Sequence, residues 1–372
     1  MSSTRHTVLH VAQPVEDGVA RVVADLSREQ VARGWDVSVA CPQDGWLSTE
    51  VVANGARHLP WTATRNPNTR TLPEARALGR LVRSATPDVV HLHSSKAGLA
   101  GRLAIRGRLP TVFSPHAWSF FHVSGPTRRA ALAWERFATR WADVVLCGSE
   151  DERRTGAEAA IAANFRVIPN TSAIDDLGLD QDSARAALGL EQEIPIIVCF
   201  GRYAHQKGQD ILLAAWPAIS AKAPDAALYL VGGGPEEERL RTLADPAVQF
   251  APAGSRDNVV RWLLAADVLV FPSRWETLSL AVLEALELGR PVVVSDCQGM
   301  AEALAGGAGT MVPREDVGRL AEAVTAFATD RELARHTGQE ARRRYREVHG
   351  AARAARFTSY TEMLTGLIAA RQ

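Results

Sequence analysis

Short apolar runs rich in β-branched residues alternate with longer amphipathic stretches along the whole chain. In the first half, the predicted strands are Thr7–Ala12, Asp36–Ala40, Asp88–His93, Thr111–Ser114, Asp143–Cys147 and Arg166–Pro169. In the second half, they are Ile194–Phe200, Ala227–Val231, Val248–Ala251, Asp267–Phe271 and Pro291–Ser295. Helical patterns such as those at 18–33, 72–84 and 211–222 lie between most of them. Continuously apolar strands that alternate with helices predict an α/β protein with parallel sheets covered on both faces.

The alternation is interrupted by a polar, irregular stretch at 171–193 and restarts near residue 194. A chain of 372 residues also exceeds the usual size of one hydrophobic core. We therefore expect two Rossmann-like doubly wound domains, residues 1–188 and 189–352, with a C-terminal helix at 353–372 that joins the first domain. Ligands of such domains bind outside the carboxyl ends of the strands, so we expect a site in a cleft between the domains.

Composition excludes some classes of protein. Lys and Arg together number 42, as do Asp and Glu, so the charge gives no support for a nucleic-acid partner. No apolar run approaches the ~18–20 residues of a membrane span, and the N-terminal apolar run is too short for a signal peptide. The four cysteines are far apart and form no C-x-x-C pair, which predicts buried free thiols in a reducing compartment. We expect a cytoplasmic protein, with the inner face of the plasma membrane as an alternative location.

Local charge is less even than the total. Five arginines fall within a short stretch of the first half: Arg102, Arg106, Arg108, Arg128 and Arg129. Such a cluster could contact anionic lipid headgroups. Solvated surface arginines are an equally good interpretation, and the sequence leaves both open.

A glycine-bounded loop with two cations follows the strand predicted at 194–200. It reads Phe-Gly-Arg-Tyr-Ala-His-Gln-Lys-Gly from Phe200 to Gly208. Gly201 and Gly208 permit a tight turn, and Arg202 and Lys207 can converge on a pyrophosphate. Fixed cations of this kind can stabilise a departing diphosphate without a metal ion. The alternative interpretation is an ordinary loop with surface charges.

A second segment, Pro-Ser-Arg-Trp-Glu-Thr-Leu-Ser-Leu-Ala-Val-Leu-Glu at 272–284, also follows a strand. Its apolar pattern predicts a helix from Leu278, so backbone N–H groups at 277–279 could receive a phosphate. Glu284 would lie ~7–8 Å further along the helix axis, which suits a ribose, and Glu276 would precede the helix beside the sugar. Two exposed glutamates without a ligand are the alternative.

Two shorter motifs carry less information. Val231-Gly-Gly-Gly-Pro235 predicts a turn whose backbone can approach a ligand closely, as many tight turns can. Asp180-Gln-Asp182 matches a D-x-D manganese motif but falls between the domains and not after a strand. We interpret it as a solvated turn, and no metal-ligand cluster is apparent in the sequence.

Taken together, these residues resemble the family 4 retaining glycosyltransferases of the GT-B fold. The resemblance rests on the loop with Arg202 and Lys207, on 231–235, on 276–285 and on Gly289-Arg-Pro-Val-Val-Val-Ser. The first half adds His-Leu-His-Ser-Ser-Lys-Ala-Gly-Leu-Ala-Gly from His91. The resemblance implies that Arg202 and Lys207 bind the donor diphosphate, that the second glutamate binds the ribose and that the first neighbours the sugar. It also implies transfer with retention and without a metal.

Two positions of the first half correspond less closely. Gly18 is the only candidate for the paired glycines that the family usually has after its first strand. His116, in Ser-Pro-His-Ala-Trp, matches the histidine that touches the donor sugar, although a histidine at a strand end is often structural. The family commonly has Gly-Phe-Gly where this chain has Thr277-Leu278-Ser279, and the larger side chains narrow the pocket.

The function predicted is transfer of a sugar from a nucleotide-sugar, with UDP expected and GDP next, to a hydroxyl of a glycan, lipid-linked or small-molecule acceptor. No cofactor and no metal are expected. The expected catalytic residues are His116, Glu276, Arg202 and Lys207. The expected donor-binding residues are Gly18, Gly201, Arg202, Lys207, Gly233, Arg256, Glu276, Thr277, Leu278, Ser279, Leu280 and Glu284.

Three other functions remain to be weighed. A nucleotide-sugar isomerase of the GT-B fold, such as a UDP-sugar 2-epimerase, is the main alternative and would consume donor without an acceptor. An NAD-dependent oxidoreductase needs a G-x-G-x-x-G turn with an acidic residue about 20 positions later, which neither glycine turn provides. A non-catalytic sugar-binding protein would not need this set of charged residues around a diphosphate.

Overall fold

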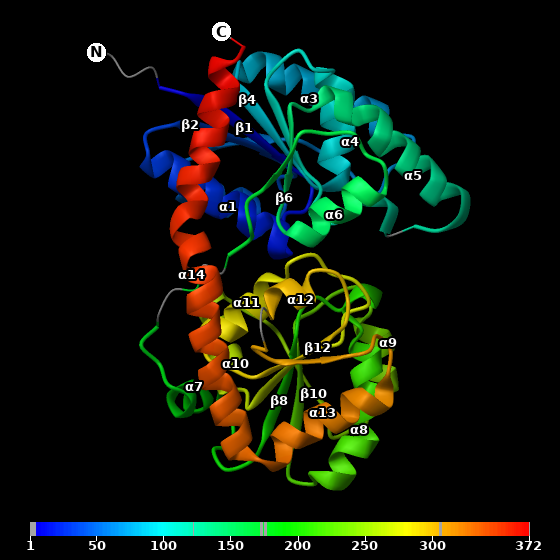
Figure 1. Cartoon of the computed structure of the whole chain (residues 1–372), viewed down its shortest axis with the longest axis vertical. Coiled ribbons are helices and arrows are strands. Elements are labelled where there is room, and N and C mark those ends of the chain that lie inside the picture. The colour runs from blue at the N-terminus through cyan, green and yellow to red at the C-terminus, as the bar shows by residue number, and fades with distance from the viewer. Residues whose placement is uncertain (1–4, 122, 172–173, 175–176, 305–306, 372) are drawn as a thin grey trace. The chain divides into compact units, whose positions relative to one another are not determined.

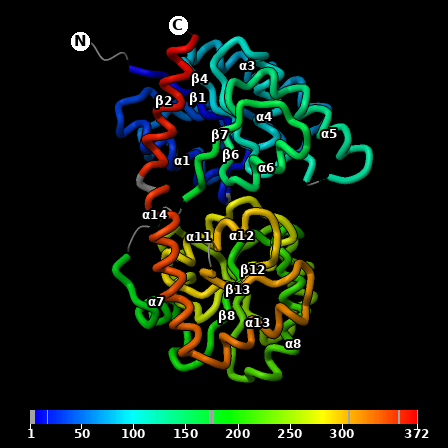
Figure 2. Tube along the Cα trace, viewed as in Figure 1, coloured from blue at the N-terminus to red at the C-terminus, as the bar shows by residue number. Residues whose placement is uncertain are grey.

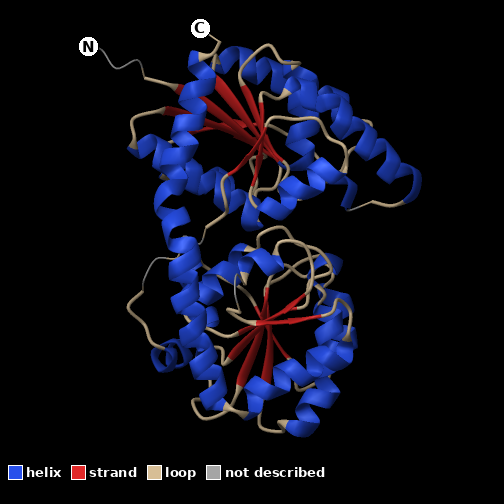
Figure 3. Ribbon diagram, viewed as in Figure 1, coloured by secondary structure: helices blue, strands red, loops and turns tan. Residues whose placement is uncertain are grey.

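The computed structural model describes residues 5–121, 123–171, 174, 177–304 and 307–371. These residues form two compact units, residues 1–170 with 354–372 (unit 1) and residues 171–353 (unit 2). Each unit is a parallel sheet with helices on both faces, which confirms the predicted α/β class (Figures 1 and 3).

The sheet of unit 1 has seven strands in the order β3-β2-β1-β4-β5-β6-β7, all paired in parallel. The strands are β1 (Thr7–Ala12), β2 (Asp36–Cys41), β3 (Arg57–Pro60), β4 (Val89–His93), β5 (Thr111–Ser114), β6 (Val144–Cys147) and β7 (Phe165–Val167). The helices between them are α1 (Asp17–Ala32), α2 (Trp46–Ala53), α3 (Thr71–Ala85), α4 (Ser94–Ile105), α5 (Gly125–Ala138) and α6 (Glu150–Glu158), with short 3₁₀ turns η1 (Ser119–Phe121) and η2 (Thr139–Trp141). The strand order reverses direction between β1 and β4.

The sheet of unit 2 has six parallel strands in the order β10-β9-β8-β11-β12-β13. The strands are β8 (Ile196–Phe200), β9 (Ala227–Val231), β10 (Gln249–Ala251), β11 (Val268–Phe271), β12 (Val292–Ser295) and β13 (Thr310–Val312). The helices are α7 (Gln181–Leu188), η3 (His205–Lys207), α8 (Gln209–Lys222), α9 (Glu237–Leu243), α10 (Arg256–Ala265), α11 (Leu280–Glu287), α12 (Met300–Ala303), α13 (Val317–Thr329) and α14 (Arg331–Ala369). Here the order reverses between β8 and β11.

The apolar alternation of each strand explains how two layers of helices cover one sheet. In β8, Ile197 and Cys199 pack in a core with α8 and α13, which lie side by side in the Cα trace (Figure 2). Their neighbours Ile196 and Val198 face a second core that includes α10 and α11. Because successive side chains of a strand point to opposite faces, a strand buried on both sides must be apolar throughout.

The sequence did not predict two strands, β3 and β13. Both are edge strands of their sheets, and β3 has no fully buried residue. An edge strand that is only half covered needs no continuous apolar run, so the pattern used for the central strands does not detect it.

The division between the units falls earlier than the boundary predicted at 188/189. Ile174 and Ala184 pack against Val260, Leu264 and Ala265 of α10, so the segment after residue 170 belongs to the core of unit 2. The segment 354–372, which includes the C-terminal part of α14, groups with unit 1.

The structure confirms that all four cysteines are buried free thiols. None of the helices in the described part of the chain is long and apolar enough to cross a bilayer.

Candidate functional site

In unit 2, the predicted donor-binding residues gather at the carboxyl ends of β8 and β11. These are the two central strands between which the strand order reverses, and loops at such a point form the usual ligand crevice of a doubly wound sheet. Arg202 and Lys207 lie in the loop after β8, and Glu276 lies in the loop after β11.

Glycines allow the loops after β8 and β9 to pack at backbone distance. A Cβ on Gly232 would lie 2.1 Å from the carbonyl oxygen of Gly201, and one on Gly208 would lie 2.0 Å from that of Pro272. The backbone N–H of Tyr203 donates to the carbonyl of Gly233 (2.9 Å). The structure therefore places Gly201 and Gly233 in adjoining turns, and only glycine permits this approach.

Lys207 and Glu276 form an ion pair across the two loops. The Nζ of Lys207 donates to Oε1 of Glu276, which also accepts from the Ser273 hydroxyl at 3.2 Å. Glu276 is 9% exposed, so its carboxylate is held by these partners and is not a mobile surface group. The two residues that the sequence assigns to diphosphate and sugar are thus in direct contact.

A further ion pair joins the 272–279 segment to the first turn of α8, and the sequence analysis missed it. The guanidinium of Arg274 donates to both carboxylate oxygens of Asp210 (2.9 and 3.0 Å) and to the carbonyl of His205 (2.8 Å). This hydrogen bonding lowers the pKa of the Asp210 carboxyl, against the burial that would raise it. Arg274 thereby fastens the 201–208 loop to the 272–279 segment, a role that a lone arginine in a sequence does not reveal.

The helix after Glu276 begins later than predicted. It starts at Leu280 with Ser279 as the N-cap, so the free N–H groups of its first turn belong to Leu280, Ala281 and Val282. Thr277 and Leu278 lie in the bend before it, and Leu278 packs into the core at 2% exposure. The prediction that 277–279 open the helix is therefore wrong, because the buried side chain of Leu278 extends the bend.

Gly299, in the turn before α12, packs against the backbone of Thr277 and Leu278 in this bend. A Cβ there would lie 1.7 Å from the carbonyl oxygen of Thr277, and its φ of +78° already favours glycine.

The nearby Cys297 is no candidate nucleophile. Burial raises the pKa of its thiol to about 12, and the charge of Glu276 acts in the same direction.

Glu284 lies on α11, and its carboxylate accepts from Arg256, the first residue of α10, at 2.7 Å. The side chain of Glu284 is 2% exposed and that of Arg256 is 28% exposed. The structure therefore brings these two predicted donor-binding residues together as a pair whose arginine still reaches the surface.

In unit 1, the corresponding edge carries Gly18 and a group of histidines. Gly18 is exposed in the first turn of α1, directly after β1. Its backbone N–H is one of those that a helix leaves without an internal acceptor, which keeps the predicted phosphate contact sterically open.

His116 occupies a strained turn after β5. Its φ is +49° and that of Ala117 is +86°, values that a side chain disfavours and that cost about 1–3 kcal/mol each. The carboxylate of Glu152 stabilises the turn by accepting from the N–H groups of Ala117 and Gly148, both at 2.8 Å. Strained, well-supported backbone of this kind is common at functional sites.

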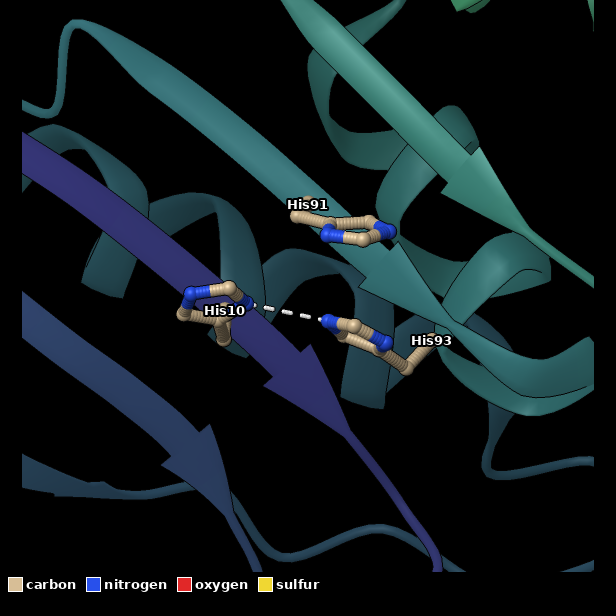
Figure 4. Close-up of side chains that lie close together, drawn as sticks. All are labelled: His10, His91 and His93. Atoms are coloured by element: carbon tan, nitrogen blue, oxygen red, sulfur yellow. Dashed lines mark hydrogen bonds between the residues drawn. The ribbon is translucent and has the colours of Figure 1, made fainter. Parts of the chain in front are cut away.

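His116 is the end of a cluster of four histidines that the sequence analysis did not find. His10 on β1 is in register with His91 on β4, and His93 follows two residues later on the same face (Figure 4). Nδ1 of His10 lies 3.0 Å from Nε2 of His93, and Nδ1 of His93 lies 3.1 Å from Nε2 of His116. Strands β1 and β4 are about 80 residues apart in sequence, so only their pairing reveals the cluster.

These histidines are neutral at physiological pH. Burial lowers the pKa of His10 to about 4, although its hydrogen bond with Gln30 acts in the opposite direction. Burial, aided by the charge of Arg356, also lowers the pKa of His116 to about 4. The pKa values of His91 and His93 are well below the usual value, first through burial and then through the neighbouring histidines.

Three of the histidines offer the geometry of a metal site, whereas no metal was expected from the sequence. One nitrogen each from His10, His91 and His93 lies within 4.8 Å of the others. Every one of these ring nitrogens has a hydrogen-bond partner. The nitrogens of His10 and His93 bond to Gln30, to each other and to His116, and those of His91 bond to Tyr360 (2.6 Å) and Ser114 (2.8 Å). The nitrogens thus have partners without an ion, and no buried donor or acceptor of the cluster points to one.

Two predictions about charged residues need revision. Arg102 is fully buried and bonds to Glu135 at 2.8 Å, so it is not part of the surface cluster predicted for the first half. Arg106, Arg108, Arg128 and Arg129 are exposed. Asp180 is not in a plain turn, because its carboxylate accepts from the N–H of Ser183 (2.9 Å) and caps α7.

Two family models match the chain. The model of glycosyl transferases group 1 matches residues 194–330, and that of Glycosyltransferase Family 4 matches residues 17–172. The first match spans the site loops of unit 2, and the second spans Gly18, His91, His93 and His116 of unit 1.

Named relatives transfer sugars. A GDP-mannose-dependent alpha-(1-6)-phosphatidylinositol monomannoside mannosyltransferase of Mycolicibacterium smegmatis is 30% identical over 327 residues, 81% of this chain and 83% of the relative. A UDP-Gal:alpha-D-GlcNAc-diphosphoundecaprenol alpha-1,3-galactosyltransferase of Escherichia coli is 27% identical over 318 residues, 80% of this chain and 82% of the relative.

The fold has a close match among solved structures. HepE of Anabaena, solved in complex with UDP and glucose, superposes with a TM-score of 0.78 at 20% identity, covering 96% of this chain and 99% of that one. Nothing in these similarities supports the isomerase that the sequence left as the main alternative. The chain belongs to glycosyltransferase family 4 and has the GT-B fold.

Proposed function

We propose that the protein transfers a sugar from a UDP-sugar to a hydroxyl acceptor with retention of configuration and without a metal ion. The observation that carries the proposal is the Lys207–Glu276 ion pair between the loops that follow β8 and β11, together with the Arg256–Glu284 pair between α10 and α11. Arg202 lies in the same loop as Lys207. This set joins two cations for a diphosphate with two carboxylates for hydroxyl groups, which is the chemistry of a nucleotide-sugar.

In this proposal, Arg202 and Lys207 stabilise the charge that develops on the diphosphate as its bond to the anomeric carbon breaks. The N–H groups of Leu280, Ala281 and Val282 at the start of α11 add partial positive charge to the same phosphate. The glycines at 201 and 233 let the donor approach the backbone.

Glu276 and Glu284 have different tasks. Glu284, one turn into α11, accepts from the ribose hydroxyls, and Arg256 donates to the same carboxylate. Glu276 accepts from a hydroxyl of the transferred sugar, and its contact with Lys207 couples the sugar to the leaving group. In this proposal His116 contacts the transferred sugar, as the resemblance to the family implies.

UDP is the proposed nucleotide because the Escherichia coli relative is named for UDP-Gal and HepE was solved with UDP. The Mycolicibacterium relative is named for GDP-mannose, so the base needs a direct test. A thermal-shift panel of UDP-, GDP-, ADP- and dTDP-sugars serves this purpose, because a bound donor stabilises the folded state by mass action. The largest shift is expected with a UDP-sugar, and a shift with GDP-sugars alone would reject the assignment.

Variants of the cations test the proposed chemistry. Arg202→Ala and Lys207→Ala should each lower kcat by roughly 10²-fold or more, about the effect of losing one electrostatic donor. Lys222→Ala is the matched control, because Lys222 is exposed at the opposite end of α8, ~20 Å from the loop. Near-native turnover in both loop variants would reject the leaving-group assignment.

A double variant separates two roles for Lys207. If Lys207 acts on the diphosphate, removing Glu276 as well should leave the enzyme no faster than Lys207→Ala alone. If Lys207 only neutralises Glu276, the double variant should recover activity over the single one.

The acceptor is proposed to be a glycan or lipid-linked sugar, with contact to a membrane surface through α5. This helix carries the exposed cations Arg128 and Arg129, and Phe137 is 45% exposed at its other end. Cosedimentation with vesicles that contain anionic lipid should fall for Arg128→Glu/Arg129→Glu and remain for Arg106→Glu/Arg108→Glu, the matched pair after α4. Equal loss in both pairs would point to net charge alone.

A further inference from the structure

The hydrogen bonds of the buried histidines run in one line that ends at His116. Oε1 of Gln30, on α1, lies 2.7 Å from Nε2 of His10. From His10 the line continues to His93 and then to His116 at 3.0 and 3.1 Å. Gln30, His10 and His93 are at most 2% exposed, whereas His116 is half-buried. The line thus leads from three buried side chains in the interior of unit 1 to the more accessible ring of His116.

Neutral imidazoles in such a line must all adopt the same tautomer. A neutral ring has one N–H and one lone pair, so a ring that accepts at one nitrogen donates at the other. His10 and His93 each use Nε2 toward one neighbour and Nδ1 toward the next, and His116 uses Nε2 toward His93. The partner of His10 at the buried end therefore decides which nitrogen of His116 carries the proton.

The orientation of the Gln30 amide decides that buried end. In the structure, the amide oxygen Oε1 of Gln30 faces Nε2 of His10 at 2.7 Å. An amide oxygen only accepts hydrogen bonds, so the proton of this contact lies on Nε2 of His10. His10 must then donate from Nε2, His93 from Nε2 to His10, and His116 from Nε2 to His93.

We propose that Gln30, His10 and His93 are positioning residues that hold His116 as the Nε2–H tautomer, with its Nδ1 lone pair available to accept a hydrogen bond from a sugar hydroxyl. Among the described residues, none makes a hydrogen bond to Nδ1 of His116 in the structure. The strained turn at His116 fixes the backbone, and the line of histidines fixes the ring and its proton. The part played by the sugar rests on the proposed function, whereas the tautomer does not.

A metal ion at the histidines is the competing arrangement, and it predicts a different state. An ion held by His10, His91 and His93 would occupy nitrogens that now bond to each other, and it would separate His116 from Gln30. Metal analysis of the purified full-length protein distinguishes the two. Less than about 0.1 equivalent of bound metal is expected, and one equivalent of zinc lost on His10→Gln substitution would overturn the line of hydrogen bonds.

The tautomer can be read directly by ¹⁵N NMR of the donor-free protein with labelled histidine, since the two nitrogens of a neutral ring differ widely in shift. The native protein should show His116 as Nε2–H at pH 7.5. His93→Leu removes its acceptor and should leave a mixture of tautomers. Gln30→Leu should do the same from the buried end, whereas Gln30→Glu retains an acceptor oxygen and should restore the Nε2–H form. An Nδ1–H His116 in the native protein would refute the proposal.

Activity supplies the second readout. His93→Leu and Gln30→Leu should lower kcat by about 10–100-fold, the usual effect of losing a residue that orients a functional side chain. His91→Gln is the control, because His91 is equally buried on β4 but bonds to Tyr360 and Ser114 outside the line. An equal loss in His91→Gln, with the tautomer of His116 unchanged in all three variants, would mean that packing alone is affected. A shifted tautomer with unchanged kcat would support the positioning and reject the role of His116 at the sugar.

Discussion

Acid should destabilise unit 1 specifically, because its central histidines are buried in the neutral form. The unfolded chain binds a proton at each histidine near pH 6.5, whereas the folded state resists protonation of His10 and His116 until about pH 4. Because the pKa of each buried histidine is lower in the folded state than in the unfolded chain, the protein keeps its full unfolding free energy above pH 6.5. It loses part of that free energy as the pH falls toward 4.

The size of the effect follows from these pKa values. Each of the two histidines should cost about 2 kcal/mol of unfolding free energy at pH 5, and about 3 kcal/mol below pH 4. His91 and His93 add to the loss in the same direction. The rings of His10, His91 and His93 contact one another, and the ring of His116 contacts that of His93. Arg356, whose own pKa is lowered by burial, lies close to His116, so the protons bind in coupled steps.

The assay is urea unfolding at pH 7.5 and pH 5, followed by hydrogen exchange of peptides from β1 and β4, which reports on unit 1 alone. His10→Gln removes one titrating group. The unfolding free energy that this variant loses from pH 7.5 to pH 5 should therefore be about 2 kcal/mol smaller than the loss in the native chain. His336→Gln, at an exposed position of α14, should behave as the native chain does. If His10→Gln and the native protein lose equal stability, the burial argument is wrong.

Three further predictions concern unit 2. Glu284→Ala should chiefly raise the donor KM, by roughly 10–150-fold, because it removes a charge-assisted hydrogen bond of about 1.5–3 kcal/mol to the ribose. The ribose does not change during the reaction, so this bond is lost equally in the ground state and the transition state. Glu276→Ala should instead chiefly lower kcat, because Glu276 contacts the transferred sugar. Steady-state kinetics with varied donor concentration measures both constants for each variant, and the reversed pattern would mean that the two glutamates have exchanged roles. Glu284→Gln retains an acceptor for Arg256 and serves as the control for loss of that contact. EDTA should leave turnover unchanged if the cations replace a metal, and a strict manganese requirement would contradict the proposed mechanism. Gly299→Ala should lower the unfolding free energy of unit 2 by at least about 1–2 kcal/mol in a urea titration, since its Cβ would overlap the Thr277 carbonyl; native stability would show that the bend can move.

The apolar pattern was sufficient for the architecture. Central strands such as β1, β5 and β9 occur within the predicted ranges, because a strand covered on both faces must be apolar throughout and little else in a sequence has that property. The glycine loop and the glutamates of unit 2 were also recognisable, because each follows its strand directly in the chain. Chemistry that is local in sequence can be read from the sequence.

The tertiary structure decided how these residues are paired. Lys207 contacts Glu276, Arg256 contacts Glu284 and Arg274 fastens two loops, although each partner is distant in the chain and its choice depends on strand order. Arg102 lies in the core and not on the surface because Glu135 is buried beside it.

The histidines show the same limit most clearly. His10 lies in β1, His91 lies in β4 and His116 follows β5, and each alone resembles a structural histidine in a sequence. Parallel pairing of β1 with β4 and of β4 with β5 sets them side by side, and burial then makes them neutral. The sequence by itself determined which residues lie at the ends of strands. The sheet determined which of them touch, because hydrogen-bonded register between strands depends on the fold of the whole unit and on no local segment.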